Sequence, residues 1–240
     1  MVGKNTAIVT GASQGIGAAV VQSFLDRGYN VVATSRGISK ANFAPSPHLV
    51  LVDGDIGQAA TADNVAQTAI GKFGSIYHIV NNAGIFAAKS LTDYGIDEFR
   101  RFVSTNLEGF IFITQLAVKQ MLSQGTGGSV TSITTSFVDH PNAGVPASIA
   151  MITKGGLDAV TRSLAIEYAK SNIRFNAVAP GQVDTPLQKN SPKEFLKALS
   201  PMGTISDAKD IAEAVVYLTE ARHVTGEVLH VDGGAHVGKW

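Results

Sequence analysis

The chain alternates between short apolar runs rich in β-branched residues and longer segments in which apolar positions recur at helical spacing. The short runs predict seven strands: Thr6–Thr10, Asn30–Thr34, His48–Val52, Ile76–Val80, Ser129–Thr134, Arg174–Val178 and Glu227–Val231. The helical spacing predicts helices from the first glycine cluster to about Arg27 and at Ala60–Phe73, Asp97–Ser123, Ala147–Ala169 and Ala208–Leu218. Nearly all-apolar strands that alternate with helices are typical of a parallel sheet covered on both faces. The pattern predicts an α/β fold, a single doubly wound (Rossmann-type) domain over residues 1–240.

Composition narrows the class of protein further. Of the 240 residues, 45% are hydrophobic and 16% are charged, which indicates a large buried core rather than a disordered chain. The 19 basic residues balance the 19 acidic ones without a basic run, so we expect neither nucleic acid nor an anionic membrane surface as a partner. No apolar run approaches the ~20 residues that span a bilayer. No signal peptide is recognisable, so we expect a soluble cytoplasmic protein.

The sequence offers no metal site. It contains no cysteine, which excludes disulfides, thiol catalysis and thiolate ligands. His223, His230 and His236 lack ligand spacing with one another and with carboxylates. His78 lies within an apolar strand pattern, where a packed core residue is the simpler interpretation.

A glycine-rich loop, Gly11–Gly17, lies directly between the first predicted strand and the first predicted helix. Glycines let the backbone approach a pyrophosphate, which the N-terminus of the following helix attracts through its free N–H groups. The spacing is Gly-x-x-x-Gly-x-Gly, not the more familiar Gly-x-Gly-x-x-Gly. Taken alone, the loop also fits a tight turn that only serves strand–helix packing.

Further motifs follow the later strands. Asn81-Asn82-Ala83-Gly84 follows the fourth, Pro180-Gly181 the sixth and Val231-Asp232-Gly233-Gly234 the last, while Lys154 opens a run of small residues in a helix. In this order, over about residues 5–235, the motifs resemble the short-chain dehydrogenase/reductase family. The resemblance implies a seven-stranded parallel sheet, a nicotinamide cofactor across the carboxyl ends of the strands, and a homotetramer.

The resemblance also assigns the cofactor site to strand ends and the loops that follow them. The expected residues are Gly11, Ser13, Gln14, Gly15, Ile16, Gly17, Ser35, Arg36, Asp55, Ile56, Asn82, Ala83, Gly84, Lys154, Pro180, Gly181, Val183 and Thr185. Many NAD-selective members place an acidic residue after the second strand, where this chain has Ser35 and Arg36. A hydroxyl and a guanidinium suit a 2′-phosphate, so NADP(H) is the preferred cofactor and NAD(H) the alternative. The competing interpretation makes Arg36 a solvated loop residue.

Catalysis in the family implies a serine, a tyrosine and a lysine, with an upstream asparagine that holds a water. Asn106 and Lys154 match the asparagine and the lysine. The serine position falls on Thr135, which fits the strand register, or on Ser136, which fits the usual chemistry. The tyrosine position, four residues before Lys154, is Ala150, and alanine cannot transfer a proton.

Ala150 leaves three hypotheses open. In the first, the chain is a natural reductase whose proton comes from a water relayed by Asn106 and Lys154, or from His140, for which an exposed loop histidine is the simpler interpretation. In the second, Ala150 is an engineered change that disables an ordinary enzyme. In the third, the chain binds dinucleotide without turnover, as a sensor or scaffold. An imine or enone reduction, in which solvent supplies the proton, is a further alternative.

Three loops form the expected substrate wall: Phe86–Ser90, Phe137–Val145 and Val183–Ser206. Their side chains are mostly apolar, so we expect a small-molecule substrate, a small or medium-sized apolar ketone or alcohol rather than a phosphorylated sugar. The stretch Thr185–Ser206 carries three prolines and is expected to be the most mobile segment.

Overall fold

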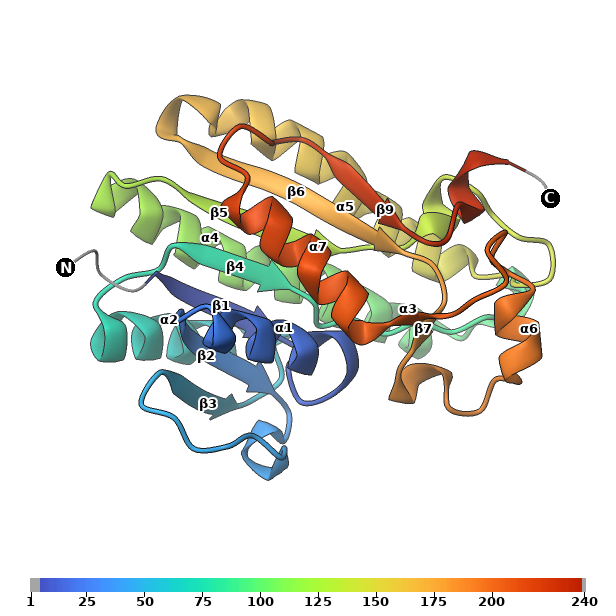
Figure 1. Cartoon of the computed structure of the whole chain (residues 1–240), viewed down its shortest axis with the longest axis horizontal. Coiled ribbons are helices and arrows are strands. Elements are labelled where there is room, and N and C mark those ends of the chain that lie inside the picture. Colours follow the sequence, from blue (N-terminus) through green and yellow to red (C-terminus); the bar gives the residue numbers. More distant parts are fainter. Residues whose placement is uncertain (1–4, 239–240) are drawn as a thin grey trace.

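Seven parallel strands form the central sheet of the computed structural model, which describes residues 5–238 (Figure 1). The strands are β1 (Thr6–Thr10), β2 (Asn30–Ser35), β3 (Leu49–Asp53), β4 (His78–Asn81), β5 (Gly128–Ile133), β6 (Ile173–Pro180) and β9 (Val228–Val231). They lie in the order β3-β2-β1-β4-β5-β6-β9. This confirms the predicted doubly wound α/β fold. Both ends of each predicted strand lie within two residues of the ends of the observed strand. Residues 1–4 and 239–240 of the expected single domain lie outside the described residues.

Helices cover both faces of the sheet (Figure 1). One face carries α1 (Gly15–Asp26) and α7 (Ala208–Glu220), and the other carries α2 (Ala59–Phe73), α4 (Gly109–Gln124) and α5 (Ser148–Glu167). Side chains alternate along β1: Ala7 and Val9 pack with the first pair of helices and Ile8 packs with the other three. Because both faces are buried, the strand is apolar at every core position, which is why the sequence pattern located it.

The helix predicted at Asp97–Ser123 is divided by a π-helical turn. α3 (Ile96–Val103) runs into the turn Ser104–Glu108 and then into α4. A π turn carries one residue more than an α turn and is frequent at functional sites. This one contains Asn106, whose side chain is buried.

The segment predicted as a mobile loop contains short regular elements. α6 (Lys193–Lys197) lies within this segment. The segment ends at Ser206, the first residue of β8 (Ser206–Asp207), which pairs with β7 (Val183–Asp184). Asp207 then caps the start of α7 with a capping box. Its side chain accepts the N–H of Lys209, and the side chain of Asp210 accepts the backbone N–H of Asp207. Elements of two and five residues are too short to show a period, so the sequence pattern missed them.

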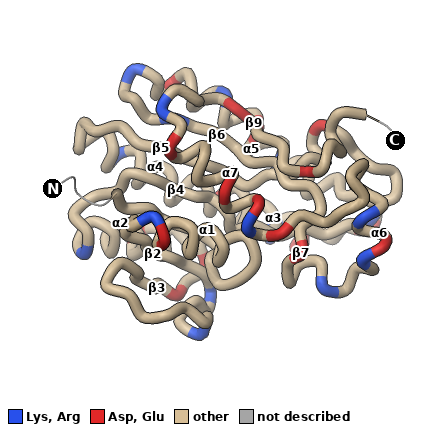
Figure 2. The backbone as a smooth tube through the Cα atoms, in the orientation of Figure 1, with Lys and Arg blue, Asp and Glu red and all other residues tan. Residues whose placement is uncertain are grey.

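Positions of basic and acidic residues are interspersed along the backbone of the helices and loops (Figure 2). Within the part of the chain that the structure describes, no helix combines the length and the apolar character needed to cross a membrane.

His78 is a buried titratable group at the amino end of β4, whereas the glycine loop lies at the carboxyl ends of the strands. Its Nδ1 pairs with Ser129 Oγ at 2.9 Å, and its ring packs edge-on against Tyr29. Within residues 5–238 its Nε2 has no hydrogen-bond partner. Burial, with a smaller contribution from the positive charge of Arg174, lowers the pKa of His78 to about 3.

This burial predicts acid sensitivity of the fold. An unfolded histidine takes up a proton near pH 6.5, whereas folded His78 stays neutral down to about pH 3. Burial of His78 therefore does not lower the free energy of unfolding above pH 6.5. As the pH drops below 6.5, the free energy of unfolding decreases, by roughly 4 kcal/mol at pH 3. We expect His78→Asn to flatten this slope in denaturant titrations from pH 7 to 4, and the exposed-site control His223→Asn to keep it. Equal slopes in the two variants would contradict the assignment.

Candidate active site

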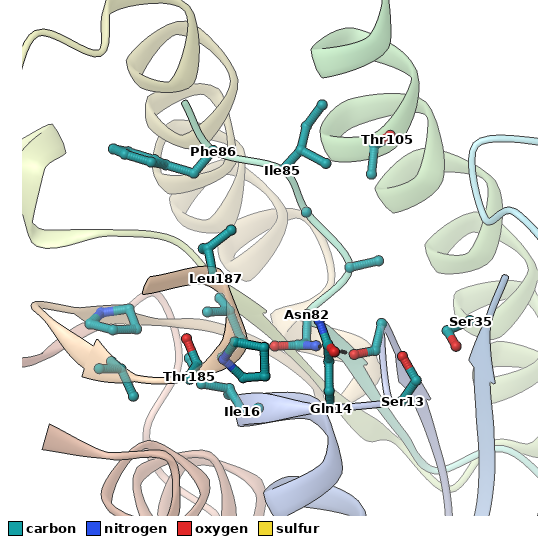
Figure 3. A pocket seen from close by; sticks show the side chains of 18 of the residues that line it. Ser13, Gln14, Ile16, Ser35, Asn82, Ile85, Phe86, Thr105, Thr185 and Leu187 are labelled. Atoms are coloured by element: carbon teal, nitrogen blue, oxygen red, sulfur yellow. Dashed lines mark hydrogen bonds between the residues drawn. The ribbon is translucent and has the colours of Figure 1, made fainter. Parts of the chain in front are cut away.

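A cleft of about 520 Å³ opens at the carboxyl ends of the strands (Figure 3). It lies where the sheet order reverses, because β1 leads to β2 and β3 on one side and pairs with β4 on the other. Open α/β sheets bind their ligands at such a switch point. Figure 3 shows Ser13, Gln14 and Ile16 along one side of the cleft and Ile85 and Phe86 across from them.

The glycine loop presents free backbone N–H groups to this cleft. α1 begins at Gly15, and its N-cap residue Gln14 makes no side-chain capping bond. The first N–H groups of any helix lack intrahelical partners, and here no cap side chain replaces them. These N–H groups of α1 therefore favour an anion. Gly11 has φ of 62°, and a Cβ atom there would lie 2.7 Å from Ala83 Cα. The loop thus needs glycine to lie this close to the β4 loop.

Asn82 joins this loop to the end of β4. Its Nδ2 donates to Thr10 O at 2.9 Å and to Gly11 O at 3.0 Å. Thr10 Oγ1 in turn accepts the backbone N–H groups of Asn82 and Ala83. Because both amide hydrogens of Asn82 are engaged, it holds the loop in shape rather than offering a donor to a ligand.

Polar groups without partners line the cleft at the end of β2. The hydroxyl oxygens of Thr34 and Ser35 are buried, and neither has a hydrogen-bond partner among the described residues. Arg36 follows them and is exposed at the cleft wall. Asp55 also lines the cleft and accepts the N–H of Gly57 at 3.0 Å. Unpaired hydroxyls beside a guanidinium fit the oxygens of a ribose or a phosphate.

Lys154, on α5, is buried yet lines the cleft. Its Nζ donates to Ile133 O at 2.6 Å, at the end of β5. Gly84 lies against the ammonium, since a Cβ atom at Gly84 would be 3.0 Å from Nζ. Burial lowers the pKa of Lys154 to about 8, and the charge of Asp158, one helical turn further on, raises it in part.

Asn106 joins two elements near the cleft through its side-chain amide. Its Nδ2 donates to Ile85 O at 3.1 Å and to Thr153 Oγ1 at 2.9 Å, and its Oδ1 accepts the N–H of Ile85 at 2.8 Å. These bonds tie the loop after β4 to α5. With both amide hydrogens engaged, the side chain has no donor left for a water relay to Lys154.

The two candidate hydroxyls after β5 face different surroundings. Thr135 lines the cleft, and its Oγ1 accepts the N–H of Phe137 at 3.4 Å at the start of the 3-10 turn Ser136–Val138. Ser136 is buried behind the wall. The turn thus favours Thr135 as the hydroxyl that meets a ligand.

Ala150 is completely buried and does not reach the cleft wall. It packs in an apolar cluster with Phe102, Ala147 and Ile149, covered by partly buried side chains that include Ile85 and Phe86. The position carries no group that can exchange a proton.

Residues 11–236 match the family model described as Enoyl-(Acyl carrier protein) reductase. A 3-oxoacyl-[acyl-carrier-protein] reductase from Bos taurus is 35% identical over 230 residues, which cover 94% of this chain and 95% of the relative. The chain belongs to the short-chain dehydrogenase/reductase family. This places it among the NAD(P)-dependent dehydrogenases and reductases.

Solved structures of similar proteins cover the whole fold of this dehydrogenase/reductase. A 3-ketoacyl-(acyl-carrier-protein) reductase from Brucella melitensis, complexed with NADH, superposes with a TM-score of 0.91 at 29% identity, over 97% of this chain and 98% of that one. A Tyr-to-Phe variant of ElxO with NADPH bound superposes with a TM-score of 0.89 at 27% identity, over 98% of this chain and 100% of that one. Similar proteins thus hold either nicotinamide cofactor on this fold.

Most residues that the family resemblance assigned to cofactor or catalysis line the cleft. They are Gly11, Ser13, Gln14, Gly15, Ile16, Ser35, Arg36, Asp55, Ile56, Asn82, Ala83, Gly84, Thr135, Lys154, Pro180, Gly181, Val183 and Thr185. Gly17, Asn106, Ser136 and Ala150 do not. Gly17 lies behind the loop against Gly11 O, and the other three are buried by the π turn, the 3-10 turn and the apolar cluster described above.

Several cleft residues were not anticipated from the sequence: Thr34, Gly37, Gly54, Ile85, Thr105, Ile133, Thr134 and Gln182. Most of them adjoin an assigned residue at a strand end, which is the signal that could have found them. Phe86 and Phe137, expected in the substrate wall, line the cleft as a stacked pair with ring centroids 6.3 Å apart. His140 is exposed and does not line the cleft, so its proposed role as proton donor has no geometric support.

No group of three or more histidine and carboxylate side chains within residues 5–238 is arranged to hold a metal ion.

Proposed function

We propose that this dehydrogenase/reductase uses NADP(H) to interconvert a small or medium-sized apolar carbonyl compound and its alcohol, without a tyrosine at the reacting centre. The main support for this proposal is that one cleft contains the uncapped N-terminus of α1, the Ser35 hydroxyl beside the Arg36 guanidinium, and the buried Lys154. These features match the three parts of a phosphorylated nicotinamide dinucleotide: its pyrophosphate, its phosphorylated ribose and its reactive end.

The cofactor fits the residues present. The N-terminus of α1 would hold the pyrophosphate, Ser35 and Arg36 the 2′-phosphate, and Lys154 the nicotinamide ribose. The unpaired Ser35 hydroxyl supports this choice, because a buried hydroxyl normally has a partner. When bound, the nicotinamide supplies or accepts the hydride. Thr135 would orient the substrate oxygen: its Oγ1 already accepts an N–H, which leaves its own proton free to donate.

The substrate side of the cleft supports an apolar carbonyl compound. Phe86 and Phe137 form a stacked aromatic wall, and Leu187 lines the cleft as a third apolar side chain. Leu187 is exposed in the described chain, so a bound apolar substrate would remove it from water.

A homotetramer stays a prediction. It is supported by large apolar side chains exposed on two helices of one face, Ile111 and Leu122 on α4 and Ile152 and Ile166 on α5.

The test is oxidation of NADPH by the purified protein with activated ketones, diketones and imines, and with NADH in parallel. We expect turnover with NADPH, and we expect Arg36→Leu to raise the KM for NADPH at least ~10-fold by removing a charge-assisted contact. The KM for NADH should stay within about twofold, and Arg222→Leu, at an exposed site outside the cleft, should change neither. Equal effects of Arg36→Leu on both cofactors would contradict the NADP(H) preference.

A non-catalytic dinucleotide-binding protein is the second candidate, favoured by Ala150 alone. Saturable NADPH binding without turnover of any substrate in the panel would support it over the oxidoreductase.

A further inference from the structure

Few side chains in the cleft can exchange a proton. Among the described residues that line it, the titratable ones are Arg36, Asp55 and Lys154. An arginine does not release its proton in proteins. Asp55 follows β3 at the edge of the sheet, whereas Lys154 contacts the end of β5 beside Thr135, the hydroxyl proposed to orient the substrate. Lys154 is thus the titratable group on the substrate side of the cleft.

Resting on the proposed function, we propose that Lys154 itself donates the proton that a tyrosine would otherwise supply, and that Asp158 is the positioning residue that keeps it charged. In the reduction, the carbonyl carbon gains a hydride from the reduced cofactor, and the carbonyl oxygen takes a proton from Nζ. The products are the alcohol, the oxidised cofactor and a neutral amine at Lys154. A proton from water then restores the ammonium.

The position of Lys154 suits a donor. The ammonium carries three hydrogens, of which one is given to Ile133 O, and no carboxylate of the described chain forms an ion pair with it. Gly84 removes the side chain that would otherwise cover Nζ. Two hydrogens therefore remain for the cofactor and the substrate oxygen.

Asp158 is a buried carboxylate that the family chemistry does not use. It follows Lys154 by four residues and so lies on the same face of α5. It is 3% exposed, and its Oδ1 has no hydrogen-bond partner within the described chain. Burial raises the pKa of Asp158, and the hydrogen bond from Thr134 opposes this. The positive charges of Arg162 and His230 lower the pKa of Asp158, and the charge of Asp158 in turn favours the ammonium of Lys154.

The pH dependence follows from the charges around this pair. Asp158 is the charged group that acts on Lys154, while Asp139 beyond β5, Arg162 on α5 and His230 on β9 act on Asp158. Carbonyl reduction should be constant at low pH and fall as pH rises through about 8, where Lys154 loses its proton. Removing the Asp158 charge should move this fall to lower pH.

The test compares Lys154→Arg, which keeps the charge but cannot release a proton, with Lys154→Ala. We expect kcat to fall ~10²–10⁴-fold in both, with NADPH still bound by Lys154→Arg. Added primary amines should restore turnover to Lys154→Ala at rates that depend on the amine pKa, a response that a structural lysine would not give. Lys72→Met, at an exposed site on α2, is the control.

Asp158→Asn tests the positioning role. We expect kcat to be nearly unchanged at pH 6 and reduced at pH 8, with the KM for NADPH within about twofold. Carbon-13 NMR of labelled lysines in the cofactor-free protein gives a readout independent of turnover: one signal should titrate near pH 8, disappear in Lys154→Arg and move lower in Asp158→Asn.

The outcomes separate this role from the proposed function. Turnover by Lys154→Arg within about threefold of the unchanged chain would overturn the role and leave the function standing. So would the absence of any lysine signal that titrates below its usual range. Absence of turnover by the unchanged chain would overturn the function and the role together.

Discussion

Gly17→Ala should weaken NADPH binding by at least ~100-fold and lower the free energy of unfolding by about 2 kcal/mol. Gly17 lies in the first turn of α1, where a Cβ atom would be 2.5 Å from Asn82 Nδ2 and would also overlap Gly11 O. Neither neighbour is free to retreat, because Asn82 Nδ2 is bonded to Thr10 O and Gly11 O. The loop must therefore move away from the β4 loop, and the N–H groups of α1 would move with it.

Gly71→Ala is the matched control for this effect. Gly71 lies inside α2, exposed, with nothing within 4 Å of an added Cβ atom. Alanine there should stabilise the fold by roughly 0.5–1 kcal/mol and leave NADPH affinity unchanged. Fluorescence titration with NADPH and urea denaturation of both variants measure the two quantities. Similar values for Gly17→Ala and Gly71→Ala would show that the glycine loop does not set the cofactor site.

Burial on both faces explains how well the sequence located the sheet. Ile8 and Val9 on β1 face opposite layers of helices, and both are fully buried, so the strand could be recognised as an unbroken apolar run. The two-residue strands β7 and β8 leave no comparable pattern. They are held by pairing between Val183 and Ser206, and such a distant contact cannot be inferred from local spacing.

The candidate site shows the same division between local and distant information. Gly11 could be placed at the cleft because it directly follows a strand end, and Lys154 because it matches the lysine of the family pattern. Asn106 could be identified by motif, but its engagement with Ile85 and Thr153 depends on a π turn that the helical pattern does not reveal. Likewise, the choice between Thr135 and Ser136 is made by a three-residue turn, which has no periodic signal of its own.

Ala150→Tyr is expected to destabilise the protein and not to restore ordinary catalysis. Ala150 has no exposed surface, and the side chains around it, Phe102 and Ile149 among them, already fill the space that a phenol ring would need. Inserting a large side chain into a packed cluster costs about 1–3 kcal/mol, which corresponds to a melting temperature lower by roughly 5 °C. We expect kcat for carbonyl reduction to stay at or below that of the unchanged chain.

Two companion variants separate packing from chemistry. Ala150→Phe adds nearly the same volume without a hydroxyl and should destabilise equally, whereas Ser148→Tyr, at an exposed site two residues earlier, should be tolerated. Thermal unfolding and steady-state kinetics on all three variants decide the matter. If Ala150→Tyr alone kept the melting temperature and raised kcat at least ~100-fold, the hypothesis of a disabled ordinary reductase would be right. Equal loss of stability in Ala150→Tyr and Ala150→Phe, without activation, would mean that alanine is part of this core and that the proton must come from another group.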